Sequence, residues 1–201
     1  NAKDETVYAK EVLTHFMSRS WRRRVTPSEV DQKLALFTKI RPACDGFQEA
    51  MLEVLATVLS SPKFLYLVRS DQPNRAEEQT NVERLSDSER ATRLSVFLWC
   101  STPDEELLDL AEKGRLSDRE VVLSQVKRML ADARSRRFSE HFVRQWLGMQ
   151  LLDFLSVDRK TYPQFGGSLK EAMREEPVAF FHEVLQNNHS VLDFIHADYT
   201  M

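Results

Sequence analysis

One string of the 201-residue sequence comes close to a metal-binding pattern, and it runs His182-Glu-Val-Leu-Gln186. A zinc protease needs a second histidine four residues after the first, because both imidazoles must lie on one face of a helix. Gln186 occupies that position. The sequence also has no Glu-x-x-His pair of a di-iron bundle, no Cys-x-x-Cys-His haem attachment string, no nucleophile elbow and no phosphate loop. We therefore predict no metal ligand, no catalytic residue and no cofactor held by this chain alone.

A polar cluster around a histidine is the first candidate for ligand binding. His141, Gln145 and Trp146 fall about one turn apart on one predicted helix, so they could form the lip of a pocket for a ligand or for a cofactor supplied by another domain. The simpler interpretation, which we favour, is a partly exposed histidine beside a tryptophan that anchors the core. We expect Trp99 to be a core anchor in the same way.

Arg93 is a further candidate, because it is a charged residue on a strongly apolar helix. The acidic run Asp104-Glu-Glu106 follows shortly after it. We expect a semi-buried ion pair, or a contact that caps a helix end, between these two helices. The alternative is a side chain whose aliphatic stem covers apolar surface while its charge stays in water.

Two basic runs have the composition of phosphate-binding patches. The first consists of Arg19 and Arg22–Arg24, and the second of Lys127, Arg128, Arg134, Arg136 and Arg137. Against nucleic-acid binding, the net charge of the chain is −3, and arginines near a helix C-terminus also complement the helix dipole. We expect solvated, dipole-matched faces and no nucleic-acid partner.

The elements that hold these residues are predicted to be helices. Five glycines in the whole chain leave little material for hairpin turns. A Ser or Thr followed three residues later by Glu, the capping box of a helix N-terminus, opens five stretches of helical apolar spacing. These boxes are Thr26/Glu29, Ser86/Glu89, Thr102/Glu105, Ser117/Glu120 and Ser168/Glu171. The sequence therefore predicts an all-α fold, an irregular bundle of about eight or nine helices with no significant sheet.

Glycine and proline refine the helix ends. Pro27 and Pro103 fit the first position of a helix, and Gly114 fits the residue that follows a helix C-terminus. Pro177 should kink its helix or restart it one turn later. The longest apolar runs, Phe64–Val68 and Val96–Cys100, have five residues, which is too short to span a membrane.

A polar stretch divides the chain into two helical parts. Residues 70–84 have no apolar period, so we predict an N-terminal helical unit over 1–69, a linker or loop over 70–85, and a larger helical unit over 86–201. Between residues 156 and 167 we expect an ordered loop whose aromatic residues, Tyr162 and Phe165, are packed down.

Two cysteines leave the redox compartment open. Cys44 and Cys100 could be inert thiols, the interpretation we favour, or could form one long-range disulfide if the chain is exported. The chain starts at Asn1 without an apolar targeting segment, and we expect both of its ends to be cut.

Several blocks resemble one family. Residues 93–99 (Arg-Leu-Ser-Val-Phe-Leu-Trp), 103–108 (Pro-Asp-Glu-Glu-Leu-Leu) and 114–116 resemble large planctomycete-type proteins of unknown function whose chains also carry c-type cytochrome segments. Residues 21–27, 61–65, 142–148 and 190–200 are similar to further blocks of that family. This sequence departs from the family pattern at Arg24, where proline is usual, at Cys100, where a small hydroxyl residue is usual, and at Pro177.

The resemblance implies export to the periplasm or cell surface and a parent protein with more domains. It makes this chain a truncated helical portion, with c-type haem held by neighbouring domains or subunits, and it supplies no catalytic residue. The leading hypothesis is a scaffold or docking module whose partners are those domains or c-type cytochrome subunits of an electron-transfer assembly. Candidate interface aromatics are Trp99, Trp146, Tyr162 and Phe165.

The alternative hypothesis is a part of a haem-dependent oxidoreductase. Its active site would be completed by haem from another domain or subunit, and the residues lining the substrate pocket would be His141, Gln145, Arg93 or Asp198. A deep polar pocket that gathers two or more of these side chains would favour the enzyme. A closed apolar core with an aromatic surface patch would favour the scaffold.

Overall fold

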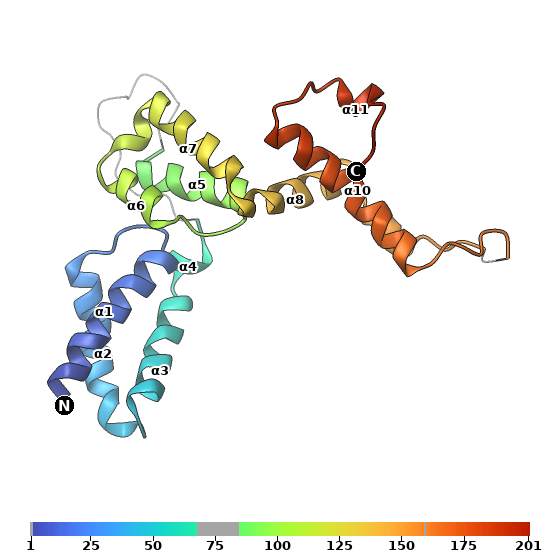
Figure 1. Cartoon of the computed structure of the whole chain (residues 1–201). Helices are drawn as coiled ribbons and strands as arrows, with labels where there is room; N and C mark the ends of the chain where they lie inside the picture. The colour runs from blue at the N-terminus through green and yellow to red at the C-terminus, as the bar shows by residue number, and fades with distance from the viewer. Residues whose placement is uncertain (1, 68–84, 159) are drawn as a thin grey trace, which may run out of the picture. The chain divides into compact units, whose positions relative to one another are not determined.

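The computed structural model describes residues 2–67, 85–158 and 160–201, and these fold into helices (Figure 1). Eight α-helices of this described part have seven or more residues, and it contains no strand, so the all-α prediction is confirmed. The α-helices are α1 (Ala2–Ser20), α2 (Pro27–Ile40), α3 (Phe47–Leu59), α4 (Pro62–Leu65), α5 (Asp87–Trp99), α6 (Glu105–Glu112), α7 (Arg119–Ala131), α8 (Arg136–Trp146), α9 (Leu151–Phe154), α10 (Gly167–Gln186) and α11 (Asp193–His196).

The chain forms two compact units. Unit 1 comprises Asn1–Val96 and Ser101–Val122, and unit 2 comprises Phe97–Cys100 and Leu123–Met201. Helices α5 and α7 therefore each begin in unit 1 and end in unit 2. The predicted linker over 70–85 lies, apart from Leu85, outside the described residues, so the predicted division of the chain stays a prediction.

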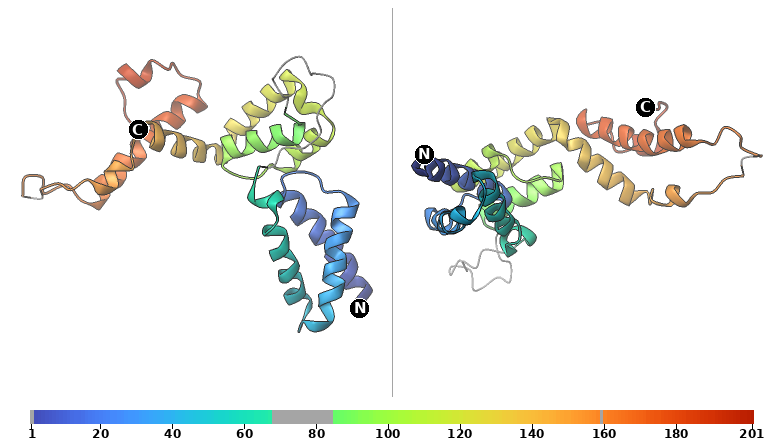
Figure 2. Two further views of the ribbon diagram at one scale, coloured as in Figure 1. Left: turned by 180° about the vertical axis from the view of Figure 1, so that it is seen from behind. Right: turned by 90° about the horizontal axis from the view of Figure 1, so that it is seen from below.

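Three helices, α1, α2 and α3, lie side by side around the core of unit 1 (Figures 1 and 2). On α1 the buried apolar residues Ala9, Leu13 and Met17 recur every four positions, which is the spacing of one helical face. The core consists of Ala9, Leu13, Met17, Trp21, Val30, Phe37, Ala50, Met51, Val54 and Val58. Burying a side chain of this size stabilises the fold by about 1.5–3 kcal/mol before the entropy cost, so this apolar face holds the three helices together.

In unit 2, α8 packs against α10 (Figure 2). Their shared core contains Val143, Met149 and Val178. Trp99 is fully buried in this unit, and its Nε1 donates a hydrogen bond of 2.9 Å to the carbonyl oxygen of Met129. The prediction of Trp99 as a core anchor is therefore confirmed.

Two of the five predicted capping boxes are present. Thr26 and Glu29 cap α2 reciprocally, with Pro27 in the first helical turn, and Ser86 and Glu89 cap α5 in the same way. At these two helices the local sequence determines the residue at which the helix begins and the side chains that bind its unpaired backbone N–H groups.

The other three boxes are wrong, because the helices begin at different residues. Asp104 caps α6 by accepting a hydrogen bond from the Leu107 nitrogen, so Pro103 lies outside that helix. Asp118 accepts from the Glu120 nitrogen. Aspartate is as good an N-cap as serine, and in both cases it lies nearer to the helix than the predicted residue. At α10 the cap is Gly166, and no side chain takes part.

Two further predictions concern helix ends. Gly114 follows α6 with φ +66°, the left-handed conformation that glycine adopts without strain, so this prediction is confirmed. Helix α10 continues through Pro177, so the predicted alternative of a restart is wrong. Val178, which follows the proline, is completely buried, and its packing helps to offset the backbone hydrogen bond that proline removes.

Candidate functional site

A cleft of about 270 Å³ in unit 2 is lined mainly by aromatic rings. Trp146 comes from α8, Phe180 and Phe181 from α10, Phe194 from α11, and Tyr199 from the segment after α11. We call it the aromatic cleft. The other lining residues are Val143, Leu147, Glu176, Pro177 and Thr200.

Some rings of the cleft meet at steep angles, whereas Phe181 stacks on Phe194 at 27°. Trp146 and Phe194 lie 5.7 Å apart between ring centroids, with an interplanar angle of 88°. Phe180 meets Phe194 at 5.8 Å and 68°, and it lies 5.3 Å from Tyr199. Edge-to-face contacts of this kind stabilise an aromatic cluster and leave ring faces turned in several directions.

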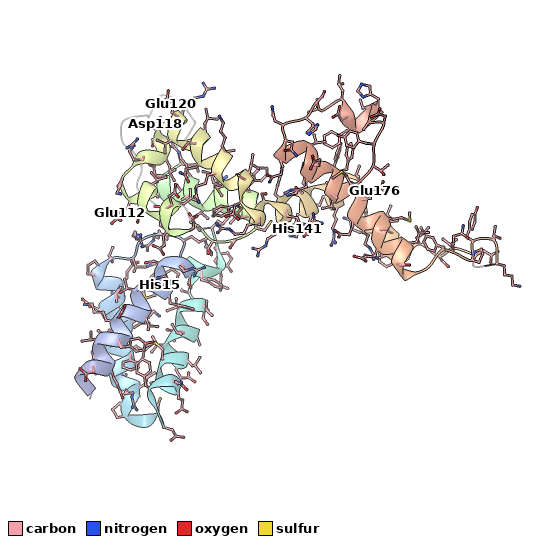
Figure 3. The ribbon with its side chains drawn as sticks, viewed as in Figure 1. His15, Glu112, Asp118, Glu120, His141 and Glu176 are labelled. Carbon is pink, nitrogen blue, oxygen red and sulfur yellow. The ribbon has the colours of Figure 1, made fainter. Side chains whose placement is uncertain are left out.

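One carboxylate is the only charged group among the residues that line the cleft. It belongs to Glu176 on α10, which is exposed and labelled in Figure 3. The adjacent Glu175 forms an ion pair of 2.7 Å with Arg136. The Tyr199 hydroxyl lies 3.4 Å from Asp193, and partial burial together with that carboxylate raises the pKa of the phenol. The phenol therefore stays neutral at physiological pH.

The structure places one of the five predicted binding residues in this cleft. Trp146 lines it and is 55% exposed, so the prediction of a core position for this tryptophan is wrong. Its position at the C-terminal end of α8 leaves one side of the indole uncovered. His141 (labelled in Figure 3), Gln145 and Asp198 are exposed and do not line the cleft. Their role in binding a cofactor or a substrate stays a prediction.

Among the residues that the structure describes, Arg93 forms no ion pair with the acidic run of α6. It is exposed in unit 1, where it lines a hollow of about 380 Å³ together with Trp21, Arg22 and Lys63. The acidic start of α6 is bound by a different residue, Arg24. This prediction failed because sequence proximity to the acidic run does not determine which arginine reaches it.

Arg24 binds three carboxylates of α6. Its guanidinium lies 2.9 Å from Glu105 and 3.7 Å from Glu112, and it forms a hydrogen bond with Asp109 (Glu112 is labelled in Figure 3). The bond to Asp109, supported by Glu105, raises the pKa of Arg24. The sequence analysis missed this contact, although the departure from the family's proline at this position was a signal.

Arg22 and Arg23 of the same run also have structural partners. Arg22 donates to the carbonyl oxygens of Lys63, Phe64 and Tyr66, at 2.9–3.1 Å, around the C-terminus of α4. Arg23 binds both carboxylate oxygens of Glu29, at 2.6 and 3.0 Å. The run is therefore a structural element of unit 1 rather than only a solvated face.

Cations of the second basic run stack on a buried indole. The guanidinium carbon of Arg134 lies 3.5 Å from the ring centroid of Trp99, and that of Arg128 lies 5.3 Å from it. Arg134 also holds the pKa of Asp132 at about 2 through hydrogen bonds from its side chain and backbone. These contacts are cation–π interactions that cover one side of the core.

A serine–histidine pair in unit 2 resembles part of a catalytic triad. Ser139 Oγ lies 3.0 Å from Nδ1 of His182, and burial lowers the pKa of this histidine. Ser139 is completely buried, so its hydroxyl cannot reach a substrate, and the pair is structural. Within the described ranges, no group of three or more His, Cys, Asp or Glu residues could hold a metal ion.

The remaining predicted residues are placed as follows. Cys44 is half-buried in unit 1, and burial raises the pKa of its thiol, whereas Cys100 is exposed in unit 2. Both are free in this structure, and a bridge between them stays a prediction that a thiol titration can test. Tyr162 is 54% exposed, so it is not packed down, while Phe165 is half-buried. In the part of the chain that the structure describes, no helix has the length and apolar character needed to cross a bilayer.

Comparison with known proteins gives two family matches. The model of PSD5, a protein of unknown function (DUF1595), matches residues 8–68. The model of PSD4, a protein of unknown function (DUF1592), matches residues 85–201, which is more than half of the chain. No curated protein and no solved structure matches the chain. The chain therefore belongs to the PSD4 (DUF1592) family.

Proposed function

We propose that this chain is a helical scaffold or docking portion of an exported protein, linked to c-type cytochromes and electron transfer, and that it is not catalytic by itself. Its partners would be other domains of the parent protein or c-type cytochrome subunits, in the periplasm or outside the cell. The haem would belong to those partners. The observation that carries this proposal is the amount of apolar surface left uncovered in unit 2.

Two segments of unit 2 expose large apolar side chains almost completely. On α9 these are Leu151 and Phe154, which is 84% exposed. At α11 they are Val191 and Ile195, which is 83% exposed. Each segment thus places two exposed apolar side chains close together in sequence, and exposed apolar groups that lie together mark protein–protein contacts more often than isolated ones do. A partner that covered α9 and α11 would remove these side chains from water.

The chemistry of the aromatic cleft also supports a binding role over a catalytic one. Its lining has a single carboxylate and no histidine, cysteine or basic residue. A redox active site that borrowed haem from a neighbour would still need polar groups to position a substrate. His141, Gln145 and Asp198 do not line this cleft, so the oxidoreductase alternative has less support.

Purification from the native source tests the proposal. The complex that co-purifies with the tagged protein is expected to show the absorption bands of c-type haem. The double variant Phe154→Ser/Ile195→Ser should reduce the haem recovered at least tenfold, because two exposed anchors are lost. The variant Leu52→Ser, which changes an exposed apolar residue of unit 1, is the matched control and should recover as much as the wild type. A colourless monomer would contradict the proposal.

A further inference from the structure

The aromatic cleft of unit 2 combines three properties that together select a type of ligand. Aromatic rings from α8, α10, α11 and the segment after α11 line the cleft. Glu176 is the single carboxylate among the lining residues, and none of them is basic. We propose that the cleft binds an organic cation that carries a trimethylammonium group. This site does not depend on the proposed docking function.

The ring arrangement supports a cation. Each aromatic ring has a negative face, and a cation within about 6 Å of the ring centroid is attracted to it. Trp146 and Phe180 each stand steeply to Phe194, at 88° and 68°. Phe181, by contrast, stacks on Phe194 at 27°. The steep pairs still turn ring faces in more than one direction, so a compact cation can contact more than one ring. Tryptophan is the strongest of these partners.

The charge distribution points the same way. Glu176 is exposed, and within the described residues it forms no ion pair. The neighbouring carboxylates of Glu175 and Asp193 have partners in Arg136 and in His189 and Tyr199. The cleft therefore carries one uncompensated negative charge beside apolar walls, which attracts a cation and repels an anion.

Size and hydration exclude other cations. A metal ion needs several oxygen, nitrogen or sulfur ligands, and one carboxylate beside aromatic rings does not supply them. A primary ammonium is strongly hydrated and would lose that water among the rings. A trimethylammonium group is weakly hydrated and presents methyl groups to the ring faces, and a cleft of about 270 Å³ has room for it.

Proton NMR of the full chain with tetramethylammonium and with choline tests the site. The N-methyl signal should move upfield with saturation, because the bound methyl groups lie over ring faces. The neutral carbon isostere of choline, in which carbon replaces nitrogen, should bind at least tenfold more weakly. Equal binding of the isostere would overturn the proposal, and so would the absence of a saturable shift with both cations.

Three variants locate the site. Trp146→Ala should weaken choline binding about 3- to 30-fold, the range expected for the loss of one cation–π contact. Glu176→Gln should weaken it about threefold. Tyr8→Ala, which changes an exposed ring of α1 that does not line the cleft, should leave binding unchanged. Unchanged affinity in both cleft variants would place the cation elsewhere and overturn the proposal.

A trimethylammonium group occurs both in free small molecules and in a lipid headgroup. Sedimentation with phosphatidylcholine vesicles, compared with phosphatidylglycerol vesicles, distinguishes the two sources. Association with the first alone, and its loss in Trp146→Ala, would identify the headgroup as the ligand. Choline binding without any association with vesicles would identify a free small molecule.

Discussion

The turn over residues 22–29 in unit 1 and the aromatic cleft in unit 2 use charged and aromatic groups in opposite ways. In the turn, Arg22, Arg23 and Arg24 each bind a separate acceptor, and Glu29 is shared by Arg23 and Lys63. In the cleft, the rings contact one another, Trp146 is half uncovered, and Glu176 has no ion-pair partner among the described residues. Partnered charges hold a fold together, whereas an unpartnered charge beside apolar surface is available to a ligand.

Removing the charge of Glu29 should have the largest effect on stability. The Glu29 carboxylate accepts hydrogen bonds from Arg23, Lys63 and the Thr26 nitrogen, and its side chain is mostly buried. Glu29→Gln should lower the free energy of unfolding by about 2–3 kcal/mol, because the charge-assisted hydrogen bonds from Arg23 and Lys63 lose their negative partner. Urea unfolding followed by circular dichroism measures it. Glu53→Gln, an exposed change on α3, is the control and should stay within about 0.5 kcal/mol of wild type.

Acid should reduce the difference in the free energy of unfolding between Glu29→Gln and the wild type. The hydrogen bonds from Arg23 and Lys63 hold the pKa of Glu29 well below its usual range. The stability that this carboxylate contributes is therefore present above its ordinary pKa, near 4.3, and is lost as the pH falls through the lower pKa of the folded state. A difference between variant and wild type that stays constant down to strong acid would contradict the role given to Glu29.

The turn also shows what the sequence could predict. The box at Thr26/Glu29 was predictable because both partners belong to one short segment and the helix follows at once. The boxes assigned to Thr102 and Ser117 failed because Asp104 and Asp118 compete for the same backbone donors from nearer positions. Local patterns therefore predict that a helix exists better than they predict the residue that caps it.

The candidate site was less predictable, because it is made by tertiary contacts. The cleft joins residues of α8, α10, α11 and the segment after α11 that lie up to 57 positions apart, from Val143 to Thr200. Helical spacing predicts that Trp146 is on an apolar face but not whether another helix covers that face. The same limit explains Arg24 and Arg93, since Arg93 is near the acidic run of α6 in sequence, whereas the fold brings Arg24 to it from 81 positions before Glu105.

Arg24→Met should have a smaller effect than Glu29→Gln, about 1 kcal/mol, because the side chain of Arg24 is 35% exposed and water screens its pairs. Its three carboxylate partners form a network, so the loss should exceed that of a single surface pair. Added salt should reduce the difference from wild type. Arg93→Met is the matched control, since Arg93 is also an exposed arginine of unit 1, and it should leave the melting temperature unchanged. The reverse order of effects would contradict the assignment of Arg24 to α6.

The smallest effect on stability concerns His182 in unit 2, because the folded protein favours the neutral form of this histidine. Burial, with the nearby positive charge of Arg136, lowers the pKa of His182, while Glu183 opposes this. As the pH falls through about 6.5, the usual pKa of histidine, the unfolded chain takes up a proton before the folded chain does, so the free energy of unfolding decreases. The decrease ends once the pH is below the lowered pKa of the folded state.

His182→Gln should flatten the pH dependence of the free energy of unfolding between pH 7 and 5, whereas His141→Gln, an exposed change on α8, should leave it as in the wild type. If unfolding of His182→Gln followed the wild-type pH dependence, the buried imidazole would not be the group that makes unit 2 sensitive to mild acid.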